Sequence, residues 1–348
     1  MENLLLKPQT IRRLLIRSTN WIGDAVMTTP AVRAIRKNFP NAHITILAKP
    51  WVAPVFEHSP DVDDILIFDA AGRHKGVFGI LRLAGDLRRC RFDATILLQN
   101  AIEAALITFM AKIPIRIGFD TDARRFLLTH PVHRTPAIKA VHQTGYYLEI
   151  LKGAGRFGGS PELSLTILPE ERKRAREILV QEGWKGRGPL IGINPSATFG
   201  PAKQWFPERY AALADQLHAA LNATIVIFGG PSDKELGCRV SGMMTSPAID
   251  LSGKTTLRDA MAVIDLCRLF VTNDSGLMHV AAALGTPQVA IFGSTNSTTT
   301  SPFSQNSRIV RVPMACSPCM KPVCPLGHMD CMKAVSVDQV MAAAADLL

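Results

Sequence analysis

The chain has 348 residues, more than one hydrophobic core normally holds, and two domains of ordinary size fit it. Its composition, 47% hydrophobic and 20% charged, excludes a disordered protein, and no run reaches the roughly 18 apolar residues of a membrane-spanning helix. Lys and Arg outnumber Asp and Glu by 39 to 29; the resulting net charge of +10 favours anionic partners such as nucleotides, phosphorylated lipids or membrane surfaces.

The first half alternates apolar, β-rich runs with amphipathic segments. A helix is expected after the first strand, and further helices near 51–58, 76–89 and 100–111. The predicted strands are 12–18, 43–48, 64–69, 94–99 and 113–119. This rhythm predicts a parallel sheet covered by helices on both faces.

The stretch KGAGRFGGSPE (152–162) interrupts the pattern and is interpreted as a linker. After it the alternation restarts, with a helix over 168–184 and a final amphipathic helix. The strands expected here are 189–196, 223–230, 248–253, 269–276 and 287–294. We therefore predict an α/β protein with an N-terminal domain (1–155) and a C-terminal domain (163–333). Residues 334–348 are expected to form a helix that packs back on the first domain.

Two doubly wound, Rossmann-like halves are expected to face each other across a cleft. Ligands of such sheets bind at the carboxyl ends of the strands. The residues that directly follow each strand are therefore the candidates for function.

In VTNDSGLMHVAAALG, Asp274, Ser275 and Gly276 join a strand to a helix whose free N–H groups favour an anion. His279 lies one turn further on and could donate to a phosphate oxygen. Ordinary helix capping explains the Asp and the Ser, but not the Gly and the His.

Two more strand ends carry polar groups. Ser196 and Thr198 follow one strand, and Lys203 in the same loop could neutralise a leaving diphosphate, although most lysines are simply solvated. After FGG (228–230), Glu235 could accept from ribose hydroxyls.

In the first half, Asp24 follows a buried strand and a glycine. It could serve as a general base for an acceptor hydroxyl, or simply compensate the charge at a helix N-terminus. The Asp-x-Asp pairs at 61–63 and 120–122 match a metal-diphosphate pattern but are interpreted as turn residues. No metal is expected at the candidate site.

Four cysteines, Cys316, Cys319, Cys324 and Cys331, crowd together with His328 in CSPCMKPVCPLGHMDC. This density is compatible with a structural zinc site, but the spacing matches no standard zinc module. A loop of free thiols is the alternative, and the sequence leaves the choice open.

Three long segments resemble the ADP-heptose lipopolysaccharide heptosyltransferases, inverting glycosyltransferases of family 9 with the GT-B fold. These are RSTNWIGDAVMTTPAVRAIRKNFP, KQWFPERYAALA, and the stretch from DLSGKTTLRDAM to QVAIFGST. The form Asn-Trp-Ile-Gly-Asp of the first loop is more similar to heptosyltransferase II than to heptosyltransferase I.

The resemblance implies that Asp24 is the base and that Lys203 and His279 hold the diphosphate of ADP-heptose. It further implies phosphate contacts for Ser196 and Thr198, ribose binding for Glu235, and heptose contact for Asp274, with backbone amides from Ser275 and Gly276. The implied acceptor is heptosyl-Kdo2-lipid A at the inner face of the cytoplasmic membrane, and no metal or cofactor is implied. Candidates for the anionic groups of the acceptor are Arg73, Lys75, Arg116 and Arg124.

Heptosyltransferase I or III and a non-catalytic nucleotide-binding protein remain the alternatives. The N-terminus lacks the pattern of a signal peptide, so we expect a cytoplasmic protein. No nucleic-acid-binding motif is present, and no nucleic-acid partner is expected. No long, basic, interfacial amphipathic helix is evident, so membrane contact is expected to be peripheral and driven by the acceptor.

Overall fold

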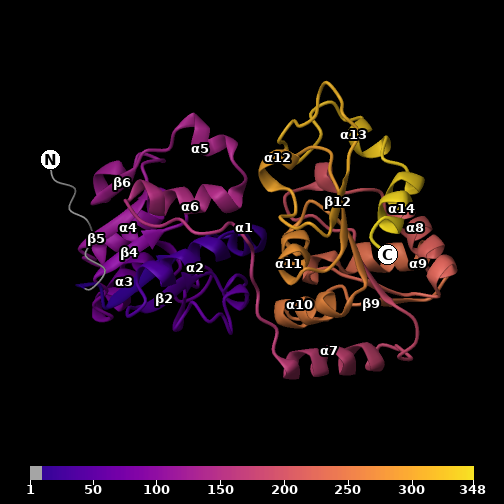
Figure 1. The fold of residues 1–348 in the computed structure, drawn as a ribbon, viewed down its shortest axis with the longest axis horizontal. Coiled ribbons are helices and arrows are strands. Elements are labelled where there is room, and N and C mark those ends of the chain that lie inside the picture. Colours follow the sequence, from indigo (N-terminus) through magenta and orange to yellow (C-terminus); the bar gives the residue numbers. More distant parts are fainter. Residues whose placement is uncertain (1–9) are drawn as a thin grey trace. The chain divides into compact units, whose positions relative to one another are not determined.

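A computed structural model describes residues 10–348, which divide into two compact units on either side of a boundary between residues 166 and 167. Each unit is built on a six-stranded, fully parallel sheet (Figure 1). Among the described helices none has the length and apolar character needed to cross a membrane. The predicted α/β architecture with two Rossmann-like domains is confirmed.

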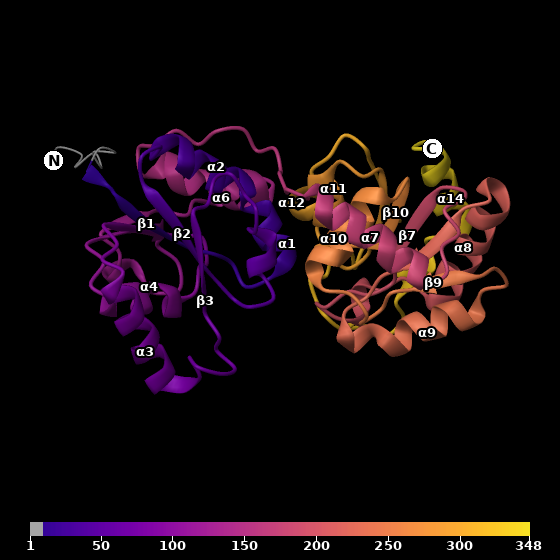
Figure 2. The same ribbon diagram turned by 90° about the horizontal axis from the view of Figure 1, so that it is seen from below.

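The sheet of the first unit has the strand order β3-β2-β1-β4-β5-β6. Its strands are β1 (Arg13–Arg17), β2 (His43–Ala48), β3 (Asp64–Ile67), β4 (Ala94–Leu97), β5 (Ile115–Phe119) and β6 (His130–Val132). Its helices are α1 (Ile22–Met27), α2 (Thr29–Asn38), α3 (Gly76–Arg89), α4 (Ile102–Met110), α5 (Pro136–Ala140) and α6 (Gln143–Gly153). Helices α3 and α4 lie side by side on one face of the sheet, and α2 packs against α6 on the other (Figure 2).

The second sheet has the order β12-β11-β10-β7-β8-β9. Its strands are β7 (Leu190–Asn194), β8 (Thr224–Ile227), β9 (Ala248–Asp250), β10 (Leu269–Asn273), β11 (Gln288–Ile291) and β12 (Ser307–Val310). Its helices are α7 (Pro169–Gln181), α8 (Pro207–Leu221), α9 (Lys234–Met243), α10 (Leu257–Leu266), α11 (Gly276–Leu284), α12 (Ser297–Thr300), α13 (Asp330–Lys333) and α14 (Val337–Ala345).

The central strands are apolar along their length because helices cover both faces of each sheet. In β1, for example, Leu14, Leu15 and Ile16 are fully buried. A buried salt bridge between Glu171 of α7 and Arg258 of α10 joins two helices of the second unit.

The structure corrects two predictions about the chain's organisation. The interpreted linker is bound along α2, where Arg33 donates to the Glu162 carbonyl and the Ser164 amide donates to Thr29 Oγ1 (3.2 Å). The domain boundary accordingly falls later, between residues 166 and 167. The C-terminal helix belongs to the second unit, where Val335 and Val340 enter the core with α14 packed on α8, β11 and β12.

Candidate active site

The strand order of the second sheet reverses between β7 and β10, two neighbouring strands. Such a reversal opens a crevice at the carboxyl ends of the strands, because the connections leave in opposite directions. The loop of residues 195–205 follows β7, and residues 274–279 follow β10. The structure therefore brings two of the predicted clusters to one edge of the sheet.

Lys203 and Asp274 meet at this edge. Lys203 Nζ lies 2.7 Å from Asp274 Oδ2, and the two side chains are 15% and 5% exposed. Thr295, just after β11, donates its hydroxyl to the same carboxylate oxygen at 2.6 Å. The lysine is consequently held in place by a carboxylate that is itself fixed by a third strand end.

Asn273 clamps both ends of the loop that carries Lys203. Its amide nitrogen donates to the Pro195 carbonyl (2.8 Å), and its amide oxygen accepts from the Trp205 amide (2.9 Å). The Trp205 indole is buried and donates to the Val335 carbonyl (3.0 Å). These contacts fix the position of Lys203, and residue spacing alone gives no signal for them.

The same loop needs a glycine at one point. Gly200 has φ +150°, and a Cβ there would lie 2.3 Å from the Pro322 carbonyl oxygen. The backbone amide of Ala202, two residues further along the loop, donates to this same carbonyl oxygen (3.0 Å). The loop that carries Lys203 therefore packs against Pro322 of the cysteine-rich segment.

Helix α11 begins at this edge with Ser275 as its N-cap, whose hydroxyl accepts from the Met278 amide. The side-chain amide nitrogen of Asn194 donates to the same hydroxyl (2.9 Å) and thereby ties the cap to the end of β7. The remaining N–H groups of the first turn have no partner within the helix, and such groups attract anions at helix N-termini. His279 is buried in this turn.

The other residues predicted to bind the donor differ in exposure. Ser196 is buried at the end of β7, whereas Thr198, two residues later, is exposed. Glu235 is exposed in the first turn of α9, after the β8 loop, in which Asp233 accepts from the Gly230 amide (2.8 Å).

In the first unit, the corresponding reversal lies between β1 and β4. Asp24 follows β1 in the first turn of α1 and is half-buried. The pKa of the buried Tyr147 is raised well above its usual value, first by desolvation and then by the negative charge of Asp24. The carboxylate therefore lies near the end of the strand and is partly open to solvent.

Two buried cations that the sequence did not single out lie at the same edge. Arg17 ends β1, and burial lowers its pKa to about 10. Lys49 directly follows β2, and its pKa is lowered by desolvation and by Arg17. Its ammonium lies 3.4 Å from the centre of the Phe68 ring. Two cations held so close together make this edge attractive to an anion.

The four predicted acceptor contacts fall into two groups. Arg73 and Lys75 are exposed in the loop before α3, where Arg73 pairs with Asp86 (2.7 Å). The structure contradicts the prediction for Arg124, whose buried guanidinium donates to the Phe119 and Gln99 carbonyls. Arg116 is half-buried, and its guanidinium likewise donates to main-chain carbonyls.

The Asp-x-Asp pairs also have structural partners. Asp63 accepts from the Ile44 amide (2.7 Å) and pairs with Arg36. Asp120 contacts His133 (2.9 Å).

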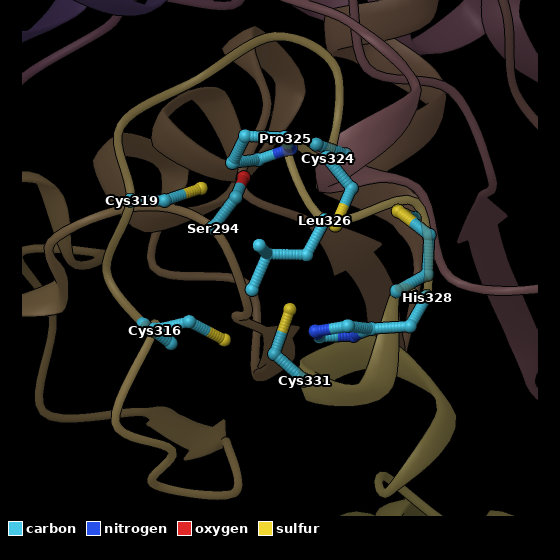
Figure 3. A pocket seen from close by; sticks show the side chains of 11 residues that line it. Ser294, Cys316, Cys319, Cys324, Pro325, Leu326, His328 and Cys331 are labelled. Carbon is cyan, nitrogen blue, oxygen red and sulfur yellow. The ribbon is translucent and has the colours of Figure 1, made fainter.

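The four clustered cysteines and His328 line a small cavity of about 20 Å³ (Figure 3). Their thiols are free. Within residues 10–348, no group of three or more His, Cys, Asp or Glu side chains is arranged so as to hold a metal ion.

Comparison with known proteins identifies the family. Residues 80–330 match the model of glycosyltransferase family 9 (heptosyltransferase). The chain is 32% identical to lipopolysaccharide heptosyltransferase 2 of Salmonella typhimurium over 86% of this chain and 88% of that protein. It is 26% identical to an Escherichia coli lipopolysaccharide heptosyltransferase 3, over 82% and 84% of the two chains.

Solved structures of the same family are also similar to this chain. E. coli ADP-heptose heptosyltransferase II superimposes with a TM-score of 0.81 at 27% identity, covering 96% of this chain and 98% of that one. A family 9 glycosyltransferase of Veillonella parvula gives 0.86 at 27% identity, covering 97% of each chain. The fold is therefore GT-B, and the chain belongs to glycosyltransferase family 9, the heptosyltransferases.

Proposed function

We propose that this heptosyltransferase moves L-glycero-D-manno-heptose from ADP-heptose to heptosyl-Kdo2-lipid A at the inner face of the cytoplasmic membrane. The observation that carries the donor assignment is the convergence of Lys203 with the N-terminus of α11 at the strand reversal of the second sheet. A fixed ammonium beside free backbone N–H groups suits a diphosphate. The acceptor assignment rests on sequence identity, which is higher to relatives named heptosyltransferase 2 (32% and 29%) than to a relative named heptosyltransferase 3 (26%).

In the proposed reaction, the Asp24 carboxylate takes the proton of a heptose hydroxyl on the acceptor. The oxygen attacks the anomeric carbon of the donor, and the bond from that carbon to the diphosphate oxygen breaks. Its electron pair leaves with ADP, whose charge meets Lys203 and the N-terminus of α11. Direct displacement of this kind inverts the anomeric centre and requires no metal.

Asp274 has a double assignment in this proposal. It orients Lys203 in the absence of donor and contacts the heptose when donor is bound. A diphosphate that binds Lys203 replaces the carboxylate as its counter-ion, which releases Asp274 for the sugar hydroxyls. His279, Ser196, Thr198 and Glu235 keep the donor contacts predicted from the sequence.

The deciding experiment incubates the purified protein with ADP-heptose and each acceptor in the presence of EDTA, with products identified by mass spectrometry. Gain of one heptose on heptosyl-Kdo2-lipid A supports the whole proposal, including metal independence. Transfer only to Kdo2-lipid A assigns the activity of heptosyltransferase I, and transfer only to a longer core assigns that of heptosyltransferase III. ADP binding without transfer to any acceptor overturns the acceptor assignment and leaves the donor site standing.

A further inference from the structure

Helices α3 and α4 of the first unit expose large apolar side chains to solvent. On α3, Phe78 is 85% exposed and Val77 72%; on α4, Phe109 is 49% exposed. We call this surface the α3–α4 face; its apolar members are Val77, Phe78, Leu81, Ile102, Leu106 and Phe109.

These side chains do not belong to the core of the unit. The opposite sides of the same helices already supply that core, through Leu83 and Leu87 of α3 and Ile107 of α4. Both helices are therefore apolar on two sides, whereas a helix on the surface of a globular protein is normally polar on its outer side. An exposed patch of neighbouring apolar side chains with a basic border marks an interaction surface.

The border of the α3–α4 face is strongly basic. Between residues 73 and 91 the chain carries five arginines and Lys75 but a single carboxylate, Asp86. That carboxylate is already paired with Arg73 (2.7 Å) and Arg89 (3.0 Å). At the other helix, the guanidinium of Arg116 lies 5.3 Å from the centre of the Phe109 ring.

We propose that the α3–α4 face binds the surface of an anionic phospholipid bilayer. Its apolar side chains would enter the boundary between headgroups and acyl chains, and the surrounding arginines would contact lipid phosphates. Apolar side chains on one face with Lys and Arg beside them are the features by which helices lie in a membrane interface. The charge favours this occupant over a second copy of the chain, because a second copy would bring the same basic border against itself.

The position of the face fits the proposed function, on which this inference rests. Helix α3 begins directly after the loop that carries Arg73 and Lys75. That loop follows β3 at the carboxyl edge of the sheet, the edge at which Asp24 follows β1. A bilayer on the outer side of α3 would bring a lipid-anchored acceptor to this edge. Residue patterns alone do not signal this face, because the helix also carries buried apolar residues and its exposed ones become visible only in the fold.

The test uses the full chain and vesicles that contain no acceptor. One set is phosphatidylcholine alone, and the other contains about one third phosphatidylglycerol. We expect sedimentation with the anionic vesicles and little with the neutral ones, with binding that weakens as salt rises. The paired changes Phe78→Ser/Leu81→Ser and Arg82→Glu/Arg88→Glu should each lower the apparent partition coefficient by roughly tenfold or more.

Matched controls come from α7 of the second unit, where Val180 is 59% exposed and Arg176 is exposed. Val180→Ser and Arg176→Glu should bind vesicles like the unchanged protein. Equal binding by face variants and controls, or no binding by the unchanged protein, would overturn the proposal. So would a dimer in sedimentation velocity that only the face variants dissociate, since this would assign the face to a second copy.

Activity provides a second readout that separates this inference from the proposed function. Phe78→Ser/Leu81→Ser should lower transfer to acceptor embedded in anionic vesicles while leaving transfer to a deacylated, water-soluble acceptor unchanged. An equal loss on both acceptors would overturn the membrane role. If the protein transfers no heptose to any acceptor, the proposed function fails, and vesicle sedimentation alone decides whether the α3–α4 face binds a membrane.

Discussion

Replacing Lys203 with Met separates its structural role from its role toward the donor. The change removes the cation that neutralises Asp274, whose side chain is 5% exposed and keeps only the Thr295 hydroxyl as a described side-chain partner. Breaking a buried ion pair by removing one partner costs about 3–5 kcal/mol, and the partial exposure of Lys203 favours the lower end. For a unit of this size, about 3 kcal/mol corresponds to a fall in melting temperature of roughly 6–12 °C.

The double variant Lys203→Met/Asp274→Asn tests the origin of that loss. The amide oxygen of the introduced asparagine can still accept from Thr295, and no charge is left buried, so stability should return to within about 1 kcal/mol of the unchanged protein. ADP affinity should not return, because the diphosphate has lost a charge-assisted contact worth about 1.5–3 kcal/mol, or roughly tenfold to a hundredfold in Kd. Thermal unfolding and calorimetric titration with ADP measure the two effects.

Asp274→Asn alone should change ADP affinity and heptose transfer in different ways. Lys203 then has no carboxylate with which the diphosphate must compete, so ADP should bind at least as tightly as to the unchanged protein, while heptose transfer falls. An unchanged melting temperature for Lys203→Met, or a loss of stability that the double variant does not recover, would refute the structural reasoning. Unchanged ADP affinity in Lys203→Met would refute the phosphate role.

Three further outcomes are expected. Asp24→Ala should lower turnover by roughly 10²–10⁴-fold with ADP affinity intact, and near-normal turnover would remove Asp24 as the base. Asp215 accepts from the Ser246 hydroxyl and from the Thr245 and Ser246 amides, and these hydrogen bonds lower its pKa to about 2. Asp215→Asn should therefore cost about 1 kcal/mol at neutral pH, discounted for solvent screening, and the urea midpoints of the two proteins should converge as the pH falls from 4 to 2. In the cysteine-rich loop, hydrogen bonds from backbone N–H groups, that of Met329 first, lower the pKa of Cys324, whereas burial raises the pKa of Cys331. Iodoacetamide should therefore label Cys324 before Cys331 in a time course followed by mass spectrometry. The reverse order would contradict this assignment.

The direction of the pH effect at Asp215 follows from its lowered pKa. The folded state holds the carboxylate charged down to about pH 2, whereas the unfolded chain binds a proton near pH 4. The stabilisation is therefore complete above about pH 4 and is lost as the pH falls through the folded-state value. A difference between the two proteins that persisted at pH 2 would exclude this carboxylate as its source.

The buried strands were predictable because continuous apolar runs of β-branched residues have few alternatives in a two-domain α/β protein. The predicted strand 43–48 coincides with β2. Two of the four edge strands, β6 and β12, were missed. β6 contains Pro131, and β12 exposes Arg308 and Ile309, so neither shows the apolar run of a central strand. The helix predicted over 51–58 is reduced to a single 3-10 turn at Ala53–Val55, which contains Pro54.

The sequence predicted which residues lie at the candidate site better than it predicted which of their side chains contact one another. Lys203 and Asp274 both follow strands, but they lie 71 positions apart in the chain, and only the adjacency of β7 and β10 makes them an ion pair. The burial of Arg124 is equally invisible in the sequence, since its arginine-rich surroundings suggest a surface. Local spacing predicts which strand end carries a residue, while sheet order decides what that residue touches.

At the proposed donor site, the ion pair with Asp274 would hold Lys203 charged and in place until a diphosphate binds. A solitary ammonium with 15% exposure would be costly to desolvate, and Asp274 offsets that cost while the donor is absent. In the proposed site, the diphosphate would replace Asp274 as the counter-ion of a lysine that the fold already holds in position, so the loop clamped by Asn273 would not need to reorganise. This preorganisation is what an electrostatic role in catalysis requires, since a lysine that first had to be ordered would spend the same free energy at the moment of reaction.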